Sequence, residues 1–233
     1  MREITREITQ EEINEKVKAH KLWLDSKEKQ GEQAVFTNVS ITNKDFSHRN
    51  LLGAVFENVE VKNADFRKTN LSSTRFKNVH FHHVFFNDAI LTDIKFWYCN
   101  ITNTAYFCAN LKNAAFTNTT LINVDFRRSN LRYANFSTAK IENIFVTNAI
   151  PMNVLGQRVI CMQVNTSRRN NLIAYWADLG IWTTGCFQGT LEELREKVAE
   201  THKDNPFLRA RYERAINYIL EEDRADKEKE QEK

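Results

Sequence analysis

The segment Phe56–Phe76 has the sequence FENVEVKNADFRKTNLSSTRF, in which a large apolar residue occupies every fifth position. The same spacing continues without interruption from Phe36 to Ile141, over 22 positions that are each five residues apart. Helices repeat a face about every 3.6 residues and strands about every two, so neither element accounts for a period of five. A fixed short period over roughly a hundred residues is typical of a solenoid. The chain is therefore predicted to form one continuous coil with these apolar residues pointing inward.

A longer period of twenty residues is superimposed on the pentads. At the inward positions phenylalanine alternates with an aliphatic residue, and only Phe81 and Tyr106 depart from this order. The second residue after the inward one is Asn in two successive pentads and is then mostly another residue in the next two. The Asn residues that follow this rule are Asn38, Asn43, Asn58, Asn63, Asn78, Asn103, Asn118, Asn123 and Asn143. We therefore expect four pentads in each turn of the coil, with Phe stacked on Phe and ladders of Asn side chains along two corners.

The pentads ADFRK (Ala64–Lys68), ANLKN (Ala109–Asn113) and ANFST (Ala134–Thr138) resemble the A(D/N)LXX motif of pentapeptide-repeat proteins. The resemblance implies a mainly β fold, the right-handed quadrilateral β-helix of that family. The sequence departs from the family pattern two positions before the inward residue, where the family usually has a small residue. Val59 and Val79 stand at this position, and we expect the coil to be locally wider there.

The chain before the repeats has the pattern of one helix, Thr9–Gly31. Thr9 and Glu12 have the spacing of a capping box, and Gly31 is a suitable residue to end the helix. The apolar stripe of this helix consists of Ile13, Val17, His20 and Leu24, with Trp23 beside them. Because the first coil would otherwise expose unpaired backbone groups and apolar side chains, the helix is predicted to lie across it as a lid.

After Ile141 the repeat weakens, and Pro151 and Gly156 indicate a linker or turn. Residues beyond Glu221 are almost all charged and are expected to fray or to be disordered. The sequence is therefore divided into a capping helix at residues 1–32, a β-helix at 33–148, a C-terminal α+β capping module at 149–222 and a charged tail at 223–233.

The C-terminal module is predicted to contain a short antiparallel sheet and two helices. Its strands are expected at residues 158–164, 171–177 and 179–187, and its helices after Gly189 and after Asn205. The run GCFQGTLEEL, which begins at residue 185, resembles a C-terminal module of bacterial and phage pentapeptide-repeat proteins. We expect the module to cover the second open end of the coil.

Motifs for catalysis are absent from the sequence, which contains no phosphate-binding glycine loop, no HExxH motif, no CxxC pair and no nucleophile elbow. Cys186 and His202 would form a Cys–His pair if their strand and helix were adjacent. No third residue is evident that would orient the histidine, and a buried cysteine is ordinarily inert. No enzymatic activity and no cofactor are therefore expected.

Glu60, His80 and His82 form the one group with the composition of a metal site. On a strand His80 and His82 point to the same side, about 6.6 Å apart, and the twenty-residue period places Glu60 below His80. The group would stand on an open surface without a pocket or supporting residues. We therefore prefer to interpret these histidines as exposed surface residues.

The charge of the repeat region bears on its function. Between residues 36 and 141 there are 13 basic and seven acidic residues, a net charge of +6. An acidic rod that imitates DNA needs a dense negative surface, and direct nucleic-acid binding would need a stacked Lys/Arg stripe, which the repeats lack. We favour a non-enzymatic scaffold that binds a protein partner, such as a phage- or bacterium-encoded regulator of a host protein. The alternative, a DNA-mimic modulator of gyrase or topoisomerase, depends on the family resemblance alone.

Few features of the sequence indicate the cellular location or the oligomeric state of the protein. The sequence has no run of eighteen apolar residues, no signal-peptide core before Thr9, and four cysteines at unpatterned spacings. These features favour the cytoplasm and argue against a membrane protein. A homodimer formed through the C-terminal module is compatible with the family resemblance, but no residue requires it.

Exposed aromatic residues in the middle coils are the predicted partner-binding site. Phe85 and Phe107 are expected to point outward on one face, with Ile90 on the next face, whereas Trp97 and Tyr98 form a separate patch on the opposite face. Outward side chains add nothing to the core, and aromatic residues are favoured as anchors in interfaces. Two alternatives are that the ends of the chain fold back over these residues and that the face mediates self-association.

Overall fold

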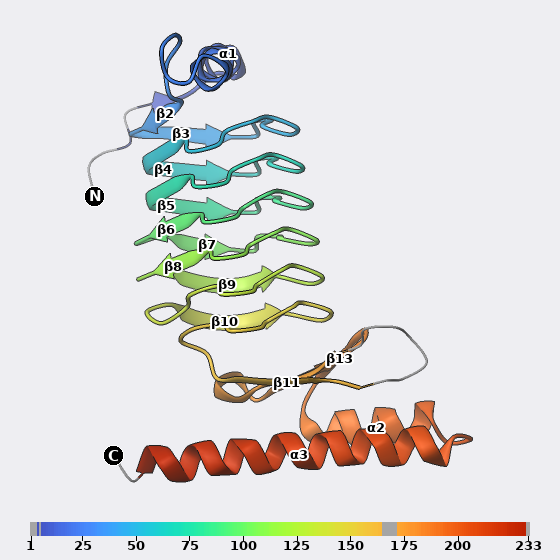
Figure 1. Cartoon of the computed structure of the whole chain (residues 1–233). Helices are drawn as coiled ribbons and strands as arrows, with labels where there is room; N and C mark the ends of the chain where they lie inside the picture. The colour runs from blue at the N-terminus through green and yellow to red at the C-terminus, as the bar shows by residue number, and fades with distance from the viewer. Residues whose placement is uncertain (1–3, 5, 165–171, 232–233) are drawn as a thin grey trace.

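The structure, a computed structural model, describes residue 4, residues 6–164 and residues 172–231. It has three parts along one axis: helix α1 at one end, a stack of coils, and a C-terminal module of a sheet and two helices at the other end (Figure 1). The predicted mainly β solenoid with a cap at each end is confirmed.

The coils are held together by a ten-stranded sheet in which every pairing is parallel. Its strands are β1 (Arg6–Glu7), β2 (Val35–Thr37), β3 (Val39–Thr42), β4 (Val55–Lys62), β5 (Arg75–His82), β6 (Lys95–Trp97), β7 (Asn100–Thr102), β8 (Ala115–Thr117), β9 (Thr120–Asp125) and β10 (Lys140–Phe145). Between β4 and β5, Phe56 lies opposite Phe76, twenty residues further on. The predicted four pentads per turn are therefore confirmed.

Two columns of aromatic rings fill the coil. The ring of Phe36 stacks on Phe56 with centroids 4.6 Å apart, and Phe46 stacks on Phe66 at 4.5 Å. Rings of the two columns meet edge to face, which is a favourable arrangement of aromatic quadrupoles. Tyr106 continues the second column, and complete burial raises the pKa of its hydroxyl far above the usual value. The alternation of Phe and aliphatic residues thus places like side chains above one another.

The corners of the coil adopt left-handed backbone conformations. The second residue after the inward one has a φ between 49° and 60° at nearly every non-glycine position. Two Asn ladders follow these corners, in which Asn58 donates to Asn38 at 3.1 Å and Asn123 donates to Asn103 at 3.0 Å. The predicted ladders are confirmed. The left-handed conformation also occurs where the corner residue is Lys68, Tyr98, Cys108, Arg128 or Tyr133.

Helix α1 (Gln10–Asp25) lies across the first coil (Figure 1). Its capping box between Thr9 and Glu12 is formed as predicted. Ile13 and Val17 belong to the same apolar core as the inward residues of the coil, so the lid is confirmed. The helix ends before the expected Gly31, which has a φ of +74° and whose added Cβ would lie 2.3 Å from the carbonyl oxygen of Ala19. That glycine permits the chain to turn back toward the first coil.

The coil continues beyond residue 148, where its end was expected. Asn130 pairs with Ile150 and Asn135 pairs with Leu155, so the last turn extends to Leu155. In earlier turns the inward residue donates its N–H to the coil below, as Leu131 does to Ile150. Pro151 stands at an inward position of the last turn, where no further coil lies below, and proline has no N–H that would need an acceptor there. The sequence signal that indicated a linker is therefore a feature of the last coil.

The C-terminal module contains an antiparallel sheet of four strands in the order β11-β12-β13-β14. These are β11 (Val159–Gln163), β12 (Leu172–Trp176), β13 (Ile181–Thr184) and β14 (Phe187–Gly189), with the short 3₁₀ helix η1 (Ala177–Leu179) before β13. The expected third strand, 179–187, is divided because Gly185 adopts a φ of +51° and forms a hairpin. Asn171, where the second strand was expected to begin, lies outside the described residues.

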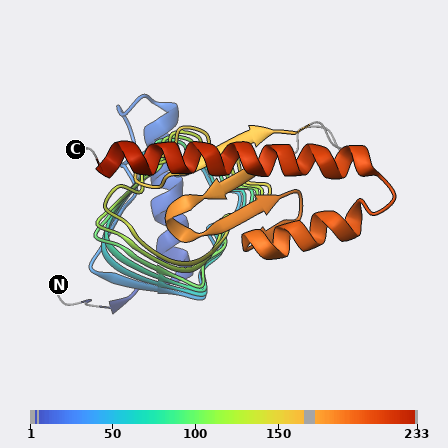
Figure 2. The same cartoon turned by 90° about the horizontal axis from the view of Figure 1, so that it is seen from below.

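The module covers the end of the coil in two layers (Figure 2). One face of the sheet packs on the last coil, where Trp176 joins the core of the coil. The other face packs on α2 (Leu191–Thr201) and α3 (Pro206–Gln231) through a second core that includes Trp182, Leu194 and Ile216.

The predicted disorder beyond Glu221 is contradicted, because α3 continues to Gln231. Asp223, within the charged segment, is buried and forms ion pairs with Arg158 at 3.0 Å and with Lys227 at 2.7 Å. The partner Arg158 lies 65 residues earlier in the sequence, just before β11. The charge run therefore contains a tertiary contact that its composition does not reveal.

Candidate functional site

One side of the coil, which we call the aromatic face, contains the pentads centred on Phe46, Phe66, Phe86, Tyr106, Phe126 and Val146. In each of these pentads, the residue before the inward one and the residue after it lie on the outer surface. The residues before the inward ones stack in parallel bridges, so that Asp65, Phe85, Ala105 and Asp125 follow one another in successive coils.

Ion pairs of identical geometry occupy this face on both sides of its middle coils. The Arg67 guanidinium lies 2.6 Å from Oδ2 of Asp65, and the Arg127 guanidinium lies 2.7 Å from Oδ2 of Asp125. Partial burial alone would raise the pKa of Asp65, but hydrogen bonds from Arg67 outweigh it and lower that pKa. Each aspartate also accepts a hydrogen bond from the backbone N–H of its arginine. The two carboxylates are therefore held in fixed positions by their arginines.

Aromatic side chains interrupt the ion pairs in the middle coils. Phe85 takes the place of the aspartate and is 46% exposed, and Ala105 takes that place in the next coil. Phe107 is half-buried, and the guanidinium groups of Arg127 and Arg128 lie 5.9 and 5.5 Å from its ring centroid. These distances fit cation–π contacts. The face thus presents an apolar centre between charged borders.

A hollow of about 340 Å³ lies beside this centre. Ala105 forms part of its lining together with Asp125, Arg127 and Phe145. Phe145 is 43% exposed and precedes the inward Val146, so it occupies the same place in its pentad as Phe85. The predicted weakening of the repeat after Ile141 is the reason that sequence reasoning misses Phe145. Extending the register by one pentad would have identified it.

The other predicted partner-binding residues lie elsewhere. Ile90 is 46% exposed on the neighbouring face. Trp97 and Tyr98 stand on the face opposite Phe85, where Trp97 is half-buried and Lys95 lies 5.5 Å from its ring centroid. Tyr98 is 60% exposed at a left-handed corner. The structure therefore does not bring Trp97 and Tyr98 together with Phe85.

Glu60, His80 and His82 lie on neighbouring strands β4 and β5. Glu60 pairs with His80 in the register, as the twenty-residue period predicted. The Glu60 carboxylate lies 2.7 Å from the Lys62 ammonium, and Nδ1 of His82 lies 2.9 Å from the Thr102 hydroxyl. Among the described residues, no three His, Cys, Asp or Glu side chains are arranged so that they could hold a metal ion.

Cys186 and His202 line a common pocket of about 460 Å³ between β14 and the helices. The His202 ring stacks on Tyr212 with centroids 5.2 Å apart. Although both Cys186 and His202 belong to the described part of the chain, no hydrogen bond joins them. The imidazole is thus oriented by ring packing rather than by an acidic residue.

Within the described ranges, no helix is both long enough and apolar enough to cross a membrane. The long helix α3 illustrates this, because charged residues occupy much of its second half.

Two family models match the repeats of this chain. One, described as a pentapeptide repeat region, matches residues 32–107, and the other, described as pentapeptide repeats in eight copies, matches residues 109–147. No curated protein matches the chain.

Several solved structures are similar to part of this chain, at low identity and low TM-score. The pentapeptide repeat protein Rfr23 from the cyanobacterium Cyanothece 51142 is 16% identical, with a TM-score of 0.38, over 53% of this chain and 88% of that chain. A trypsin-treated form of QnrB1, a plasmid-mediated fluoroquinolone resistance protein, is 18% identical, with a TM-score of 0.32, over 53% and 85%. A pentapeptide repeat protein from the Arabidopsis thaliana thylakoid lumen is 22% identical, with a TM-score of 0.31, over 47% and 63%.

A coil of stacked five-residue repeats with a cap at each end is characteristic of β-solenoid scaffold proteins. Within this class, the chain belongs to the pentapeptide-repeat family.

Proposed function

We propose that this protein is a non-enzymatic interaction scaffold whose aromatic face binds a protein partner. The observation that carries the proposal is the exposure of Phe85 and Phe145, with Phe107 between them in the chain, on one face of a rigid coil. In a bacterium or a phage, such a scaffold would regulate the host protein that it binds.

The arrangement of side chains on this face supports an interface. Protein interfaces have an apolar centre, often with aromatic anchors, inside a polar rim. Here Phe85 and the hollow beside Ala105 would form the centre, and the Asp65–Arg67 and Asp125–Arg127 pairs would form the rim. Hydrogen bonds between parallel strands already fix the backbone of the coil. Binding would therefore cost little conformational entropy in this protein, which favours affinity.

Exposure and charge argue against two alternatives, coverage of this face by the ends of the chain and imitation of DNA. The described part of α1 and of the C-terminal module leaves Phe85 46% exposed, so these segments do not cover it. Imitation of DNA would need acidic residues in excess, whereas the repeats have a net charge of +6 and the Asp65 and Asp125 carboxylates are already paired with arginines. A protein partner is therefore the better-supported candidate.

The experiment that tests this function compares capture by three forms of the protein from an extract of the native host. The forms are the wild type, the double variant Phe85→Ser/Phe107→Ser, and Tyr98→Asn as a control that removes an exposed aromatic residue from the opposite face. Proteins captured by the wild type are identified by mass spectrometry, purified and titrated against each form. We expect the double variant alone to lose binding. Equal binding by the wild type and the double variant would refute the assignment of this face.

A further inference from the structure

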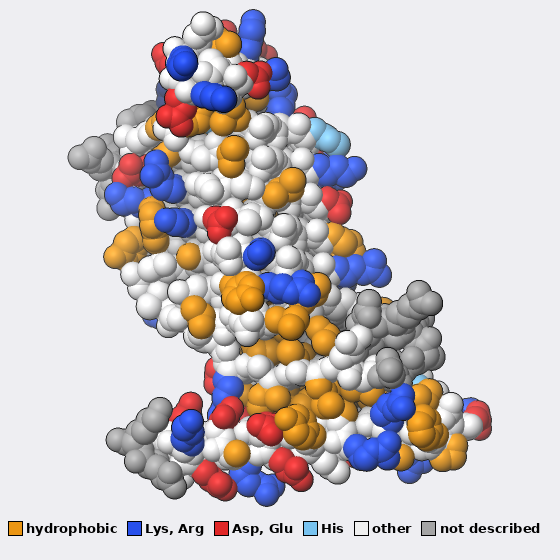
Figure 3. Space-filling model, viewed as in Figure 1, with side chains coloured by type: hydrophobic (Ala, Val, Ile, Leu, Met, Phe, Trp, Pro, Cys, Tyr) orange, Lys and Arg blue, Asp and Glu red, His pale blue; other side chains and the backbone are white. Residues whose placement is uncertain are grey.

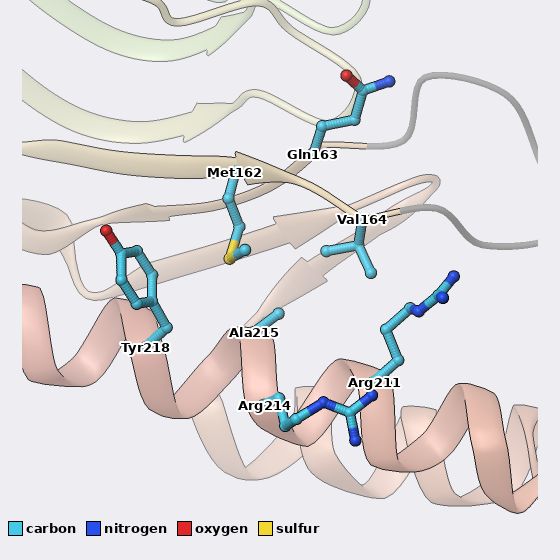
Figure 4. A pocket seen from close by; sticks show the side chains of 7 residues that line it. All are labelled: Met162, Gln163, Val164, Arg211, Arg214, Ala215 and Tyr218. Atoms are coloured by element: carbon cyan, nitrogen blue, oxygen red, sulfur yellow. The ribbon is translucent and has the colours of Figure 1, made fainter.

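A groove lies between the first strand of the C-terminal sheet and the last helix. It has a volume of about 550 Å³ and is lined by Met162, Gln163 and Val164 from the β11 side and by Arg211, Arg214, Ala215 and Tyr218 from α3. Figure 4 shows Met162 and Val164 pointing from the strand toward the helix, with Tyr218 beside Met162 and Arg211 beside Val164. The groove therefore has an apolar end and a basic end.

Strand β11 is a terminal strand of its sheet, because among the described residues it pairs only with β12. Ala177 N–H donates to the carbonyl oxygen of Arg158 at 2.8 Å, which places the residues at 158, 160 and 162 in the hydrogen-bonded pairs of this antiparallel ladder. Val159 and Cys161 then direct their backbone N–H and C=O groups away from β12. The strand therefore has backbone groups aligned to pair with a further strand.

The sequence of β11 does not protect this edge. Proteins usually block an edge strand with lysine, another charge, proline or a very short strand, because an open edge recruits other chains. Strand β11 has the sequence VICMQ, with neither charge nor proline, and four of its five residues are half-buried. Apolar side chains gather over this strand next to Lys and Arg side chains (Figure 3). The other terminal strand, β14, has only three residues.

Charge selects the kind of peptide that would fit. Arg214 is exposed and lines the helix side of the groove. Arg211 lines the same basic end and stacks its guanidinium over Phe207, 4.7 Å from the ring centroid. Alternate side chains of an added strand point to the same side, so they would reach the arginines and then the apolar surface of Met162 and Tyr218.

We propose that β11 and α3 form a docking groove for an extended acidic peptide segment of a partner, which adds to the sheet as a fifth strand. Backbone hydrogen bonds to Val159 and Cys161 supply affinity, as in other cases of strand addition. Carboxylates that meet Arg214 supply selectivity. This groove lies on the C-terminal module, so the inference does not depend on the aromatic face.

The test uses the full chain and a defined probe. The probe is the fluorescein-labelled peptide Glu-Val-Leu-Val-Glu-Val, capped at both ends and about as long as an average strand. Its alternate residues, Glu, Leu and Glu, lie on one side of the extended peptide. This order is the same in both directions, so the peptide can pair with β11 in either the parallel or the antiparallel orientation. We expect saturable binding by fluorescence anisotropy, and about tenfold or more weaker binding to Arg214→Glu. The matched control Arg209→Glu, an exposed arginine of α3 outside the groove, is expected to bind as the wild type does.

Further peptides separate strand addition from simple charge attraction. The peptide Lys-Val-Leu-Val-Lys-Val should not bind, and N-methylation of alternate backbone nitrogens in the acidic peptide should abolish its binding. Slower amide exchange at Val159 and Cys161 on binding would support the proposal. Equal binding of the N-methylated peptide, unchanged affinity of Arg214→Glu, or pairing of β11 between two copies of the chain in place of peptide binding would overturn it.

Discussion

Gln10 and Gln188 close opposite ends of the aromatic face, and each side-chain amide accepts one backbone hydrogen bond and donates another. Gln10 Oε1 accepts from the N–H of Asp45 at 2.9 Å, and its Nε2 donates to the carbonyl oxygen of Asp45 at 2.9 Å. At the other end, Gln188 Oε1 accepts from the N–H of Val146 at 2.8 Å, and its Nε2 donates to the carbonyl oxygen of Ile144 at 2.7 Å. Each side-chain amide thus replaces the peptide group of a coil that is not there.

Removal of either glutamine is expected to weaken the fold. In Gln188→Ala, Val146 N–H and Ile144 C=O lose their partner at a partly buried site, which should lower the free energy of unfolding by about 1–3 kcal/mol. Gln10→Ala should act in the same direction. Because the sites lie at opposite ends, the two losses should add in the double variant. Urea denaturation measures these values, and unchanged stability would mean that water replaces the amide at no cost.

The stacked core gives the second prediction. Phe66→Ala or Leu111→Ala should lower the free energy of unfolding by about 3 kcal/mol or more, because a cavity forms in a column of buried side chains. The outward variant Lys112→Ala should change it by less than about 0.5 kcal/mol. Chemical denaturation compares the three variants. Equal losses at inward and outward positions would contradict the register of the pentads.

A corner substitution should stabilise the coil. Tyr98 has a φ of 54°, whereas the neighbouring coils have Asn78 and Asn118 at the equivalent corner. Asn tolerates the left-handed region better than an aromatic residue and would continue the ladder, so Tyr98→Asn should raise the free energy of unfolding by about 0.5 kcal/mol or more. Thermal melting measures the change. A lower melting temperature would show that the Tyr98 ring makes contacts that outweigh the backbone preference.

The capping box of α1 gives a pH dependence. The hydrogen bond from the Arg6 side chain, and after it the one from the Thr9 N–H, lower the pKa of Glu12 to about 2. The value in the unfolded chain is higher, about 4.3. This carboxylate therefore stabilises the fold above about pH 4, and its contribution is lost as the pH falls toward 2. Glu12→Gln should flatten the melting temperature between pH 5 and 2 relative to the wild type, and Glu11→Gln is the control in the same turn. Identical pH profiles of the melting temperature for the wild type and Glu12→Gln would show that the Glu12 carboxylate is not the origin of this pH dependence.

The charge of the repeats predicts the outcome of a gyrase assay. A rod with a net charge of +6 between residues 36 and 141 lacks the negative surface that occupies a DNA-binding site. Purified protein at micromolar concentration should therefore leave gyrase supercoiling unchanged. Inhibition in that range would favour the DNA-mimic alternative over the proposed function.

The sequence predicts the coil well because its period is local. Every pentad has one inward residue, as Phe66 is in its own pentad. The five-residue spacing and the twenty-residue stacking can therefore be read from the order of residues alone. The lid helix follows from its capping box, Thr9 and Glu12, and from one apolar stripe. Neither prediction requires knowledge of contacts between distant parts of the chain.

The features that sequence reasoning missed depend on such distant contacts. Pro151 indicated a linker, but it fits the last coil because proline has no N–H that would need an acceptor from a further coil. The ion pair of Asp223 with Arg158 holds a charged segment in α3, which composition alone assigned to a disordered tail. The hollow beside Phe145 likewise appears only when the small Ala105 is stacked between larger neighbours.

Partner binding at the aromatic face is tested by titrating the identified partner with the double variant Phe85→Ser/Phe107→Ser and by recording the melting curve of this variant and its elution from a sizing column. We predict a melting temperature close to that of the wild type and loss of partner binding, with Tyr98→Asn still binding. A shift in elution of the double variant would identify the face as a contact between copies of this chain. Unfolding of the double variant, or binding equal to that of the wild type, would contradict partner binding at the aromatic face.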